Sequence, residues 1–200
     1  ADECGVDIDG LEEAALTVKD GETAKAYMDK VSEEFEKIHT KRPDLNTFNP
    51  GTNMASVGVY EEIVKGVGIR KDGSSKKIVN LRETDEWIAG VDAARTWYEN
   101  GYIRKDIASK GNALVSADEQ KQYGVTQTTW KPGQDVLDAD EMGEDVVYSL
   151  VDEPYVSRTN PLATMLSVGA DSKHPKEAVK LIYMLNSNKE LYNLLCWGIK

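Results

Sequence analysis

Cysteine and histidine are scarce in this chain of 200 residues, which contains two of each. Cys4 and Cys196 lie near opposite ends, so they can pair only if the two ends meet, and Cys4 is expected to be an ordinary buried thiol. His39 belongs to a charged helix tail and His174 to the start of another helix. No Gly-x-Ser-x-Gly elbow accompanies them. The sequence therefore gives no specific support to nucleophilic catalysis.

Long apolar runs and nucleotide-binding loops are also missing. No segment approaches the ~20 apolar residues that a membrane-spanning helix needs, and no positively charged, then apolar leader opens the chain. Gly66 and Gly68 do not make a dinucleotide fingerprint, because Lys71 stands where the third glycine belongs. No Walker loop is present. We therefore expect no transmembrane segment, no cofactor and no metal site.

Basic residues are outnumbered by acidic ones. The chain has 24 Lys and Arg against 35 Asp and Glu, which gives a formal net charge of −11. So acidic a surface repels phosphate backbones, and nucleic acid is excluded as a partner. Carboxylate pairs are abundant at this composition, so they give no specific support to a glycosidase. With 40% hydrophobic residues, the chain can bury one good core or two small ones.

The first half of the chain predicts helices that alternate with single strands. Apolar residues at helical spacing predict a short helix over residues 9–18. Residues 21–42 predict a longer helix that buries one stripe of apolar side chains and ends before Pro43. Residues 44–48 predict a strand and residues 57–67 a helix. The members of the two helical faces are Leu11, Ala14, Ala15 and Val18, and then Ala24, Met28, Val31, Phe35 and Ile38.

The middle of the chain predicts a hairpin and then the clearest helix. Residues 67–69 and 77–81 flank the Asp72-Gly73 turn signal. Thr84 is expected to cap a helix that Gly101 stops, with Tyr102 and Ile103 folding back. The expected buried face of this helix consists of Trp87, Ile88, Val91, Ala94 and Tyr98.

The last third predicts more strands before two final helices. Residues 122–129 and 146–151 are expected as strands, separated by a solvated acidic loop at 134–145. Residues 164–168 predict another strand. Pro175 then opens a helix at its first turn, and Ser187 to Glu190 form a capping box for a second helix that Gly198 ends. Its expected buried residues are Leu191, Leu194 and Leu195. Alternating helices and strands define an α/β chain.

Two segments of the chain resemble a known family. SVGADSKHPKEAVKLIYML followed by NKELYNLLCWGI is similar to the C-terminal signature of family 1 extracellular solute-binding proteins, and WYENGYIRKDI is similar to an earlier step in the same family. The branch that it resembles most is the lipid-anchored, sugar-type branch of ABC importer subunits. His174 departs from the pattern, because the family usually has a helix-capping Asn there.

The resemblance implies the fold, the partners and the location. The fold would be a periplasmic-binding-protein-like type II lobe, incomplete, with the 200 residues forming one α/β unit of a two-lobed protein and 129–200 able to cross back over the hinge. The implied function is extracellular capture of a carbohydrate, an oligosaccharide, by hinge closure for ABC permease subunits, with no catalysis. The implied location of the full-length protein is the cell surface, on a lipid anchor, or the periplasm. A glycan-processing enzyme domain and a cell-surface interaction module remain alternatives. Two facing carboxylates ~5–9 Å apart in a cleft would favour the enzyme.

Aromatic and polar residues that follow strands are the candidate ligand-binding groups. Proteins meet the apolar faces of sugars with Trp and Tyr, and the hydroxyls with polar side chains. Trp130 leaves a strand directly, although a core tryptophan is an equal alternative. For the polar loop residues, ordinary turn chemistry is the alternative. The candidates are Trp130, Tyr155, Arg158, Asn160, Thr52, Asn53 and Met54.

Overall fold

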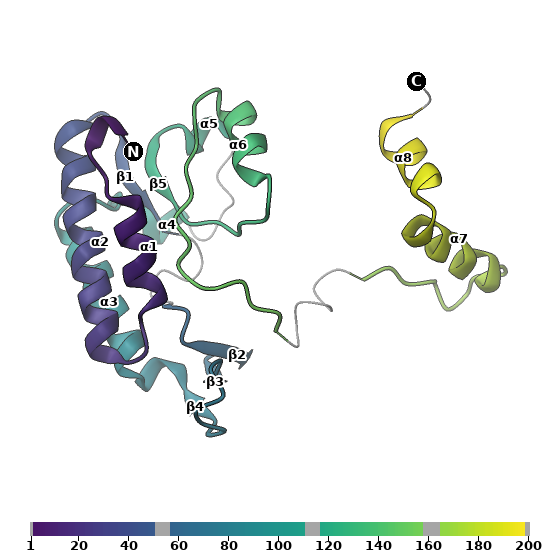
Figure 1. The fold of residues 1–200 in the computed structure, drawn as a ribbon, viewed down its shortest axis with the longest axis horizontal. Coiled ribbons are helices and arrows are strands. Elements are labelled where there is room, and N and C mark those ends of the chain that lie inside the picture. Colours follow the sequence, from purple (N-terminus) through teal and green to yellow (C-terminus); the bar gives the residue numbers. More distant parts are fainter. Residues whose placement is uncertain (1, 51–56, 111–116, 158–164, 199–200) are drawn as a thin grey trace. The chain divides into compact units, whose positions relative to one another are not determined.

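The structure is a computed structural model that describes residues 2–50, 57–110, 117–157 and 165–198. It divides into two units, residues 1–155 and residues 156–200, which are described separately (Figure 1). The predicted single α/β unit, with 129–200 returning over a hinge, stays a prediction.

Unit 1 is built on two long helices that pack against each other and against a short parallel sheet (Figure 1). Within the described residues, β1 pairs in parallel with β5, and β2, β3 and β4 form an antiparallel sheet. The helices are α1 (Ile8–Leu16), α2 (Gly21–Lys41), α3 (Asp85–Glu99), α4 (Ile107–Lys110), α5 (Ala117–Gln120) and α6 (Gln134–Met142). The strands are β1 (Asn46–Asn49), β2 (Tyr60–Val64), β3 (Val67–Arg70), β4 (Val79–Asn80) and β5 (Tyr123–Thr126). Short 3₁₀ turns occur at Asp2–Cys4 and Leu81–Glu83.

Helix α2 confirms the prediction of a long amphipathic helix. All five residues of the expected stripe are buried. The helix begins at a capping box in which the Asp20 carboxylate accepts from the Thr23 backbone N–H and the Thr23 hydroxyl bonds back. Gly124 allows α2 to lie close to β5, because an added Cβ would come within 2.8 Å of the Cγ2 of Ile38. The 3.6-residue apolar period therefore predicts which face of α2 is buried, and the capping box fixes where the helix begins.

The helix predicted for residues 57–67 is wrong. Tyr60–Val64 and Val67–Arg70 form an antiparallel hairpin in which Val64 pairs with Val67. The turn between them contains Gly66 at φ +82°, a left-handed conformation that no α-helix contains. The apolar residues of this segment are mostly β-branched and fit a strand as well as a helix. The adjoining hairpin around Asp72-Gly73 is confirmed, since β3 also pairs with β4.

Helix α3 begins where predicted but buries a different face. Thr84 Oγ1 accepts from the Trp87 N–H at 3.3 Å, which confirms the cap. The buried residues are Glu86, Gly90 and Trp97, with Ala93 and Ala94 packed against the core. The expected residues Ile88, Val91 and Tyr98 are exposed. Small side chains let α3 approach α2 closely, and this packing decides which face turns inward.

The prediction of a turn back after α3 is confirmed. The backbone N–H groups of Tyr102 and Ile103 both donate to the carbonyl of Trp97, at 2.8 and 3.3 Å, and both side chains are buried. The carbonyl of Tyr102 then accepts from the N–H of Phe48 at 2.9 Å, which brings this turn beside β1. The end of α3 is thereby attached to the parallel sheet.

Residues 134–145 and 146–151 also differ from prediction. Gln134–Met142 is helix α6 rather than a loop, and the Gln134 side-chain amide donates to Asp138 one turn later. Residues 145–155, which we call the crossing segment, contain no paired strand among the described residues. The crossing segment instead contacts the rest of unit 1 at separate points. At the first of these, the Leu150 N–H donates to Glu12 of α1 at 3.1 Å.

Unit 2 contains α7 (Pro175–Ser187) and α8 (Lys189–Trp197), as predicted. Pro175 stands in the first turn of α7, and the Asn188 side chain caps α8 by accepting from the Leu191 N–H. The predicted strand is not present in its described part, 165–168. The burial expected in α8 is wrong, because Leu194 is exposed and Leu195 is 68% exposed. The described part of this unit has no sheet against which the apolar face of α8 could pack.

Burial of a tyrosine in α2 gives a testable pH dependence. Tyr27 is buried, and burial raises the pKa of its hydroxyl to about 12. Between pH 10 and 12 the unfolded chain loses this proton while the native protein keeps it, so the unfolding free energy should fall by about 1.4 kcal/mol per pH unit. Urea titrations across this range should show a shallower fall for Tyr27→Phe than for the unsubstituted chain. Equal slopes would contradict the assignment.

Candidate functional site

The two parallel strands end at the same edge of their sheet. Asn49, the last residue of β1, is opposite Thr126, the last residue of β5. One step further, the N–H of Gln127 donates to the carbonyl of Asn49 at 3.4 Å. In open α/β sheets, ligands bind beyond the carboxyl ends of the strands. This edge is therefore where a binding site is expected from the topology.

Trp130 leaves this edge and is not a core residue. It follows β5 after three residues without regular structure and precedes α6, and its side chain is 37% exposed. This exposure argues against the alternative of a core tryptophan. Its role as a platform for a ligand stays a prediction.

Tyr155 takes part in a polar cluster between the crossing segment and the β2–β3 hairpin. Its hydroxyl donates to Glu61 Oε2 at 2.7 Å, and the Lys71 ammonium lies 5.4 Å from the centre of its ring. The bond to Glu61, with some burial, raises the pKa of Tyr155. Lys71 also forms an ion pair with Asp152. The structure thus gives Tyr155 a part in anchoring the crossing segment, and its predicted contact with a ligand remains a prediction.

The other candidates lie outside the described residues. Thr52, Asn53 and Met54 belong to the segment 51–56, and Arg158 and Asn160 to the segment 158–164. Their ligand-binding roles stay predictions. Of the predicted site, the structure therefore places Trp130 and Tyr155.

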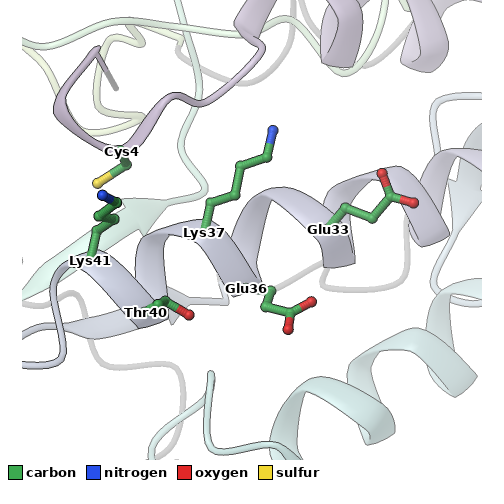
Figure 2. A pocket seen from close by; sticks show the side chains of 6 residues that line it. All are labelled: Cys4, Glu33, Glu36, Lys37, Thr40 and Lys41. Atoms are coloured by element: carbon green, nitrogen blue, oxygen red, sulfur yellow. The ribbon is translucent and has the colours of Figure 1, made fainter.

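A shallow depression of about 390 Å³ lies beside α2 (Figure 2). Figure 2 shows the Cys4 thiol directed toward Lys41, while Glu33 and Glu36 project from other parts of the same helix. Lys37 is already paired with Glu34 at 2.8 Å. None of its described lining residues is aromatic, so they offer no platform for a sugar ring. Its lining residues are Cys4, Glu33, Glu36, Lys37, Thr40 and Lys41.

The described ranges contain no metal site and no membrane-spanning helix. No group of three or more His, Cys, Asp or Glu side chains there could hold a metal ion. Cys4 is half-buried, Cys196 is exposed, and both thiols are free. No described helix combines the length and the apolarity that crossing a membrane requires.

The comparisons with known proteins point to solute-binding proteins. No family model matches the chain. A carbohydrate ABC transporter substrate-binding protein of Streptococcus pneumoniae serotype 4 is 21% identical over 177 residues, which are 82% of this chain. The chain spans only 34% of the length of that relative.

Solved structures agree on the fold. The N-glycan transport solute-binding protein NgtS of S. pneumoniae superposes with a TM-score of 0.76, at 22% identity, over 99% of this chain and 41% of its own. Its complexes with Man1GlcNAc and Man5GlcNAc give TM-scores of 0.73 and 0.67. The chain therefore has the α/β fold of a solute-binding protein over the part that it spans, as predicted. Among particular proteins, it is similar to NgtS and to the carbohydrate ABC transporter substrate-binding protein of S. pneumoniae.

Proposed function

We propose that this chain is part of the extracellular substrate-binding subunit of an ABC importer and that this subunit captures an oligosaccharide. The observation that carries the proposal is the similarity of fold over 99% of the chain to a solute-binding protein crystallised with Man1GlcNAc. The exposed Trp130 beyond the carboxyl end of β5 supports it, because the indole can stack on the C–H face of a sugar ring. In the full-length protein, hinge closure would bury the ligand between two lobes.

The proposed subunit delivers its ligand unchanged. Binding and release need neither a cofactor nor a reaction, and the partners would be the ABC permease subunits in the membrane. A lipid anchor would hold the protein at the cell surface, as in the branch that the sequence resembles. A glycan-processing enzyme would instead convert the ligand, so incubation followed by mass spectrometry of the glycan distinguishes the two functions. Recovery of intact Man5GlcNAc supports capture, and shortened products would overturn it.

The direct test is a calorimetric titration of the full-length protein. We expect Man5GlcNAc to bind and free amino acids and short peptides, which other importers carry, to give no heat of binding. Binding of peptides without binding of any glycan would refute the proposal.

The 200-residue chain alone is expected to bind the same glycan weakly, with a Kd of ~1 mM or above. It spans about a third of the curated relative, so it can supply only part of a two-lobed cleft. Each tenfold loss of affinity corresponds to ~1.4 kcal/mol of lost contacts, and half a cleft gives up several kcal/mol. Micromolar binding by the chain alone, in the same calorimeter, would show that the cleft lies within these residues.

A further inference from the structure

Gln127 carries a polar atom that the protein itself leaves unsatisfied. Its side-chain oxygen Oε1 is buried, and no hydrogen-bond partner for it exists among the residues that the structure describes. A buried amide group without a partner costs free energy, so such atoms are rare and usually have a function or a bound molecule. Among the described residues, no other buried side-chain nitrogen or oxygen lacks a partner.

The position of Gln127 makes the defect informative. Gln127 is the first residue after β5, and its backbone N–H still bonds to Asn49 at the end of β1. It therefore lies at the carboxyl edge of the parallel pair, three residues before the exposed Trp130. An exposed indole and an unsatisfied polar atom thus follow the same strand end.

A hydroxyl is the group that satisfies this site in either orientation of the amide. In the orientation observed, the buried atom is the amide oxygen, which is an acceptor and needs a donor. If the amide is turned over, the buried group becomes NH₂ and needs an acceptor. A sugar hydroxyl both donates and accepts, so it bonds in both cases, whereas an ammonium or a carboxylate would bond in one only.

We propose that Gln127 binds a hydroxyl group of the captured saccharide and is a specificity-determining residue of the site. This inference rests on the proposed capture of an oligosaccharide and adds the residue that distinguishes a hydroxyl-bearing ligand from an apolar one. The cost of the unsatisfied atom is present in the free protein and is removed on binding, which makes the interaction count fully toward affinity.

The test compares two methionine substitutions that flank β5, in the full-length protein. Gln127→Met removes the amide and keeps the length of the side chain. Gln122→Met makes the same change just before the other end of β5, where Gln122 is exposed. For Gln127→Met we expect Man5GlcNAc to bind about tenfold more weakly, which corresponds to ~1.4 kcal/mol. Gln122→Met should bind like the unsubstituted protein.

Stability of the ligand-free protein provides the second readout. Gln127→Met should unfold at the same urea concentration as the unsubstituted protein or a higher one, because it removes a buried unsatisfied group. A purely structural glutamine would instead lose stability on substitution. The inference is overturned if affinity is unchanged, or if the loss of affinity comes with a matching loss of stability, and the proposed function then still stands. If the unsubstituted protein binds no glycan, the proposed function fails and the inference with it.

Discussion

Replacing Trp97 by alanine is expected to lower the unfolding free energy of unit 1 by about 3–5 kcal/mol. The side chain is 2% exposed, and its ring centre lies 4.9 Å from that of Phe35 and 5.6 Å from that of Phe48. Its indole N–H also donates to the Ser32 hydroxyl at 2.7 Å. The substitution would remove the packing that joins α3 to α2 and β1, and would leave a cavity in the centre of the core.

Urea unfolding followed by circular dichroism measures this loss. Val91→Ala on the exposed face of the same helix is the matched control and should change stability by less than ~0.5 kcal/mol. Trp97→Phe should lie between the two, because it keeps a ring but loses the bond to Ser32. Similar midpoints for Trp97→Ala and Val91→Ala would show that the core is organised elsewhere.

Replacing Trp130 by alanine is expected to weaken glycan binding without unfolding the protein. Loss of a stacking platform should cost about 1–3 kcal/mol in affinity for Man5GlcNAc, roughly 5- to 150-fold, measured by calorimetry on the full-length protein. Folding stability should stay nearly unchanged, because the indole is already 37% exposed in the structure.

Tyr98→Ala is the control for the loss of an exposed aromatic residue. Tyr98 is exposed on α3, and its hydroxyl donates to the Lys105 carbonyl, within the turn that follows the helix. We expect its removal to leave glycan affinity unchanged. If Trp130→Ala unfolds the protein while the affinity of each folded molecule is preserved, Trp130 is a structural residue and the strand-end site is wrong.

Local signals predicted the elements that carry them. The Thr84 cap, Pro175 in the first turn of α7 and the apolar stripe of α2 each act within a few residues, and each is confirmed. The failures have two causes. The segment 57–67 carries β-branched apolar residues that fit a helix or a strand, and it pairs with the adjoining residues as the β2–β3 hairpin. Helix α3 turns its small residues inward because it packs against α2, which is distant in the sequence.

The candidate site was predictable to the extent that topology fixes it. Trp130 could be placed at a strand end because the strand predicted for residues 122–129 stops immediately before it. The hydrogen bond from Tyr155 to Glu61 joins residues that are 94 positions apart, and no local sequence pattern predicts it. The unsatisfied oxygen of Gln127 is likewise a property of the packed structure, since in the sequence Gln127 is one more residue of a predicted strand.

The pairing of β1 with β5 has a consequence for the order of events during synthesis. Asn46, at the start of β1, finds its partner Gln122 76 residues later in the chain. At ~5–20 residues per second, the ribosome needs about 4–15 s to make that stretch. Helices α1 and α2 can form meanwhile from local contacts, but β1 has no β5 with which to pair. During that interval the edge of β1 is unpaired. It can pair with another nascent chain made from the same messenger RNA, which leads to aggregation, unless a chaperone binds it first.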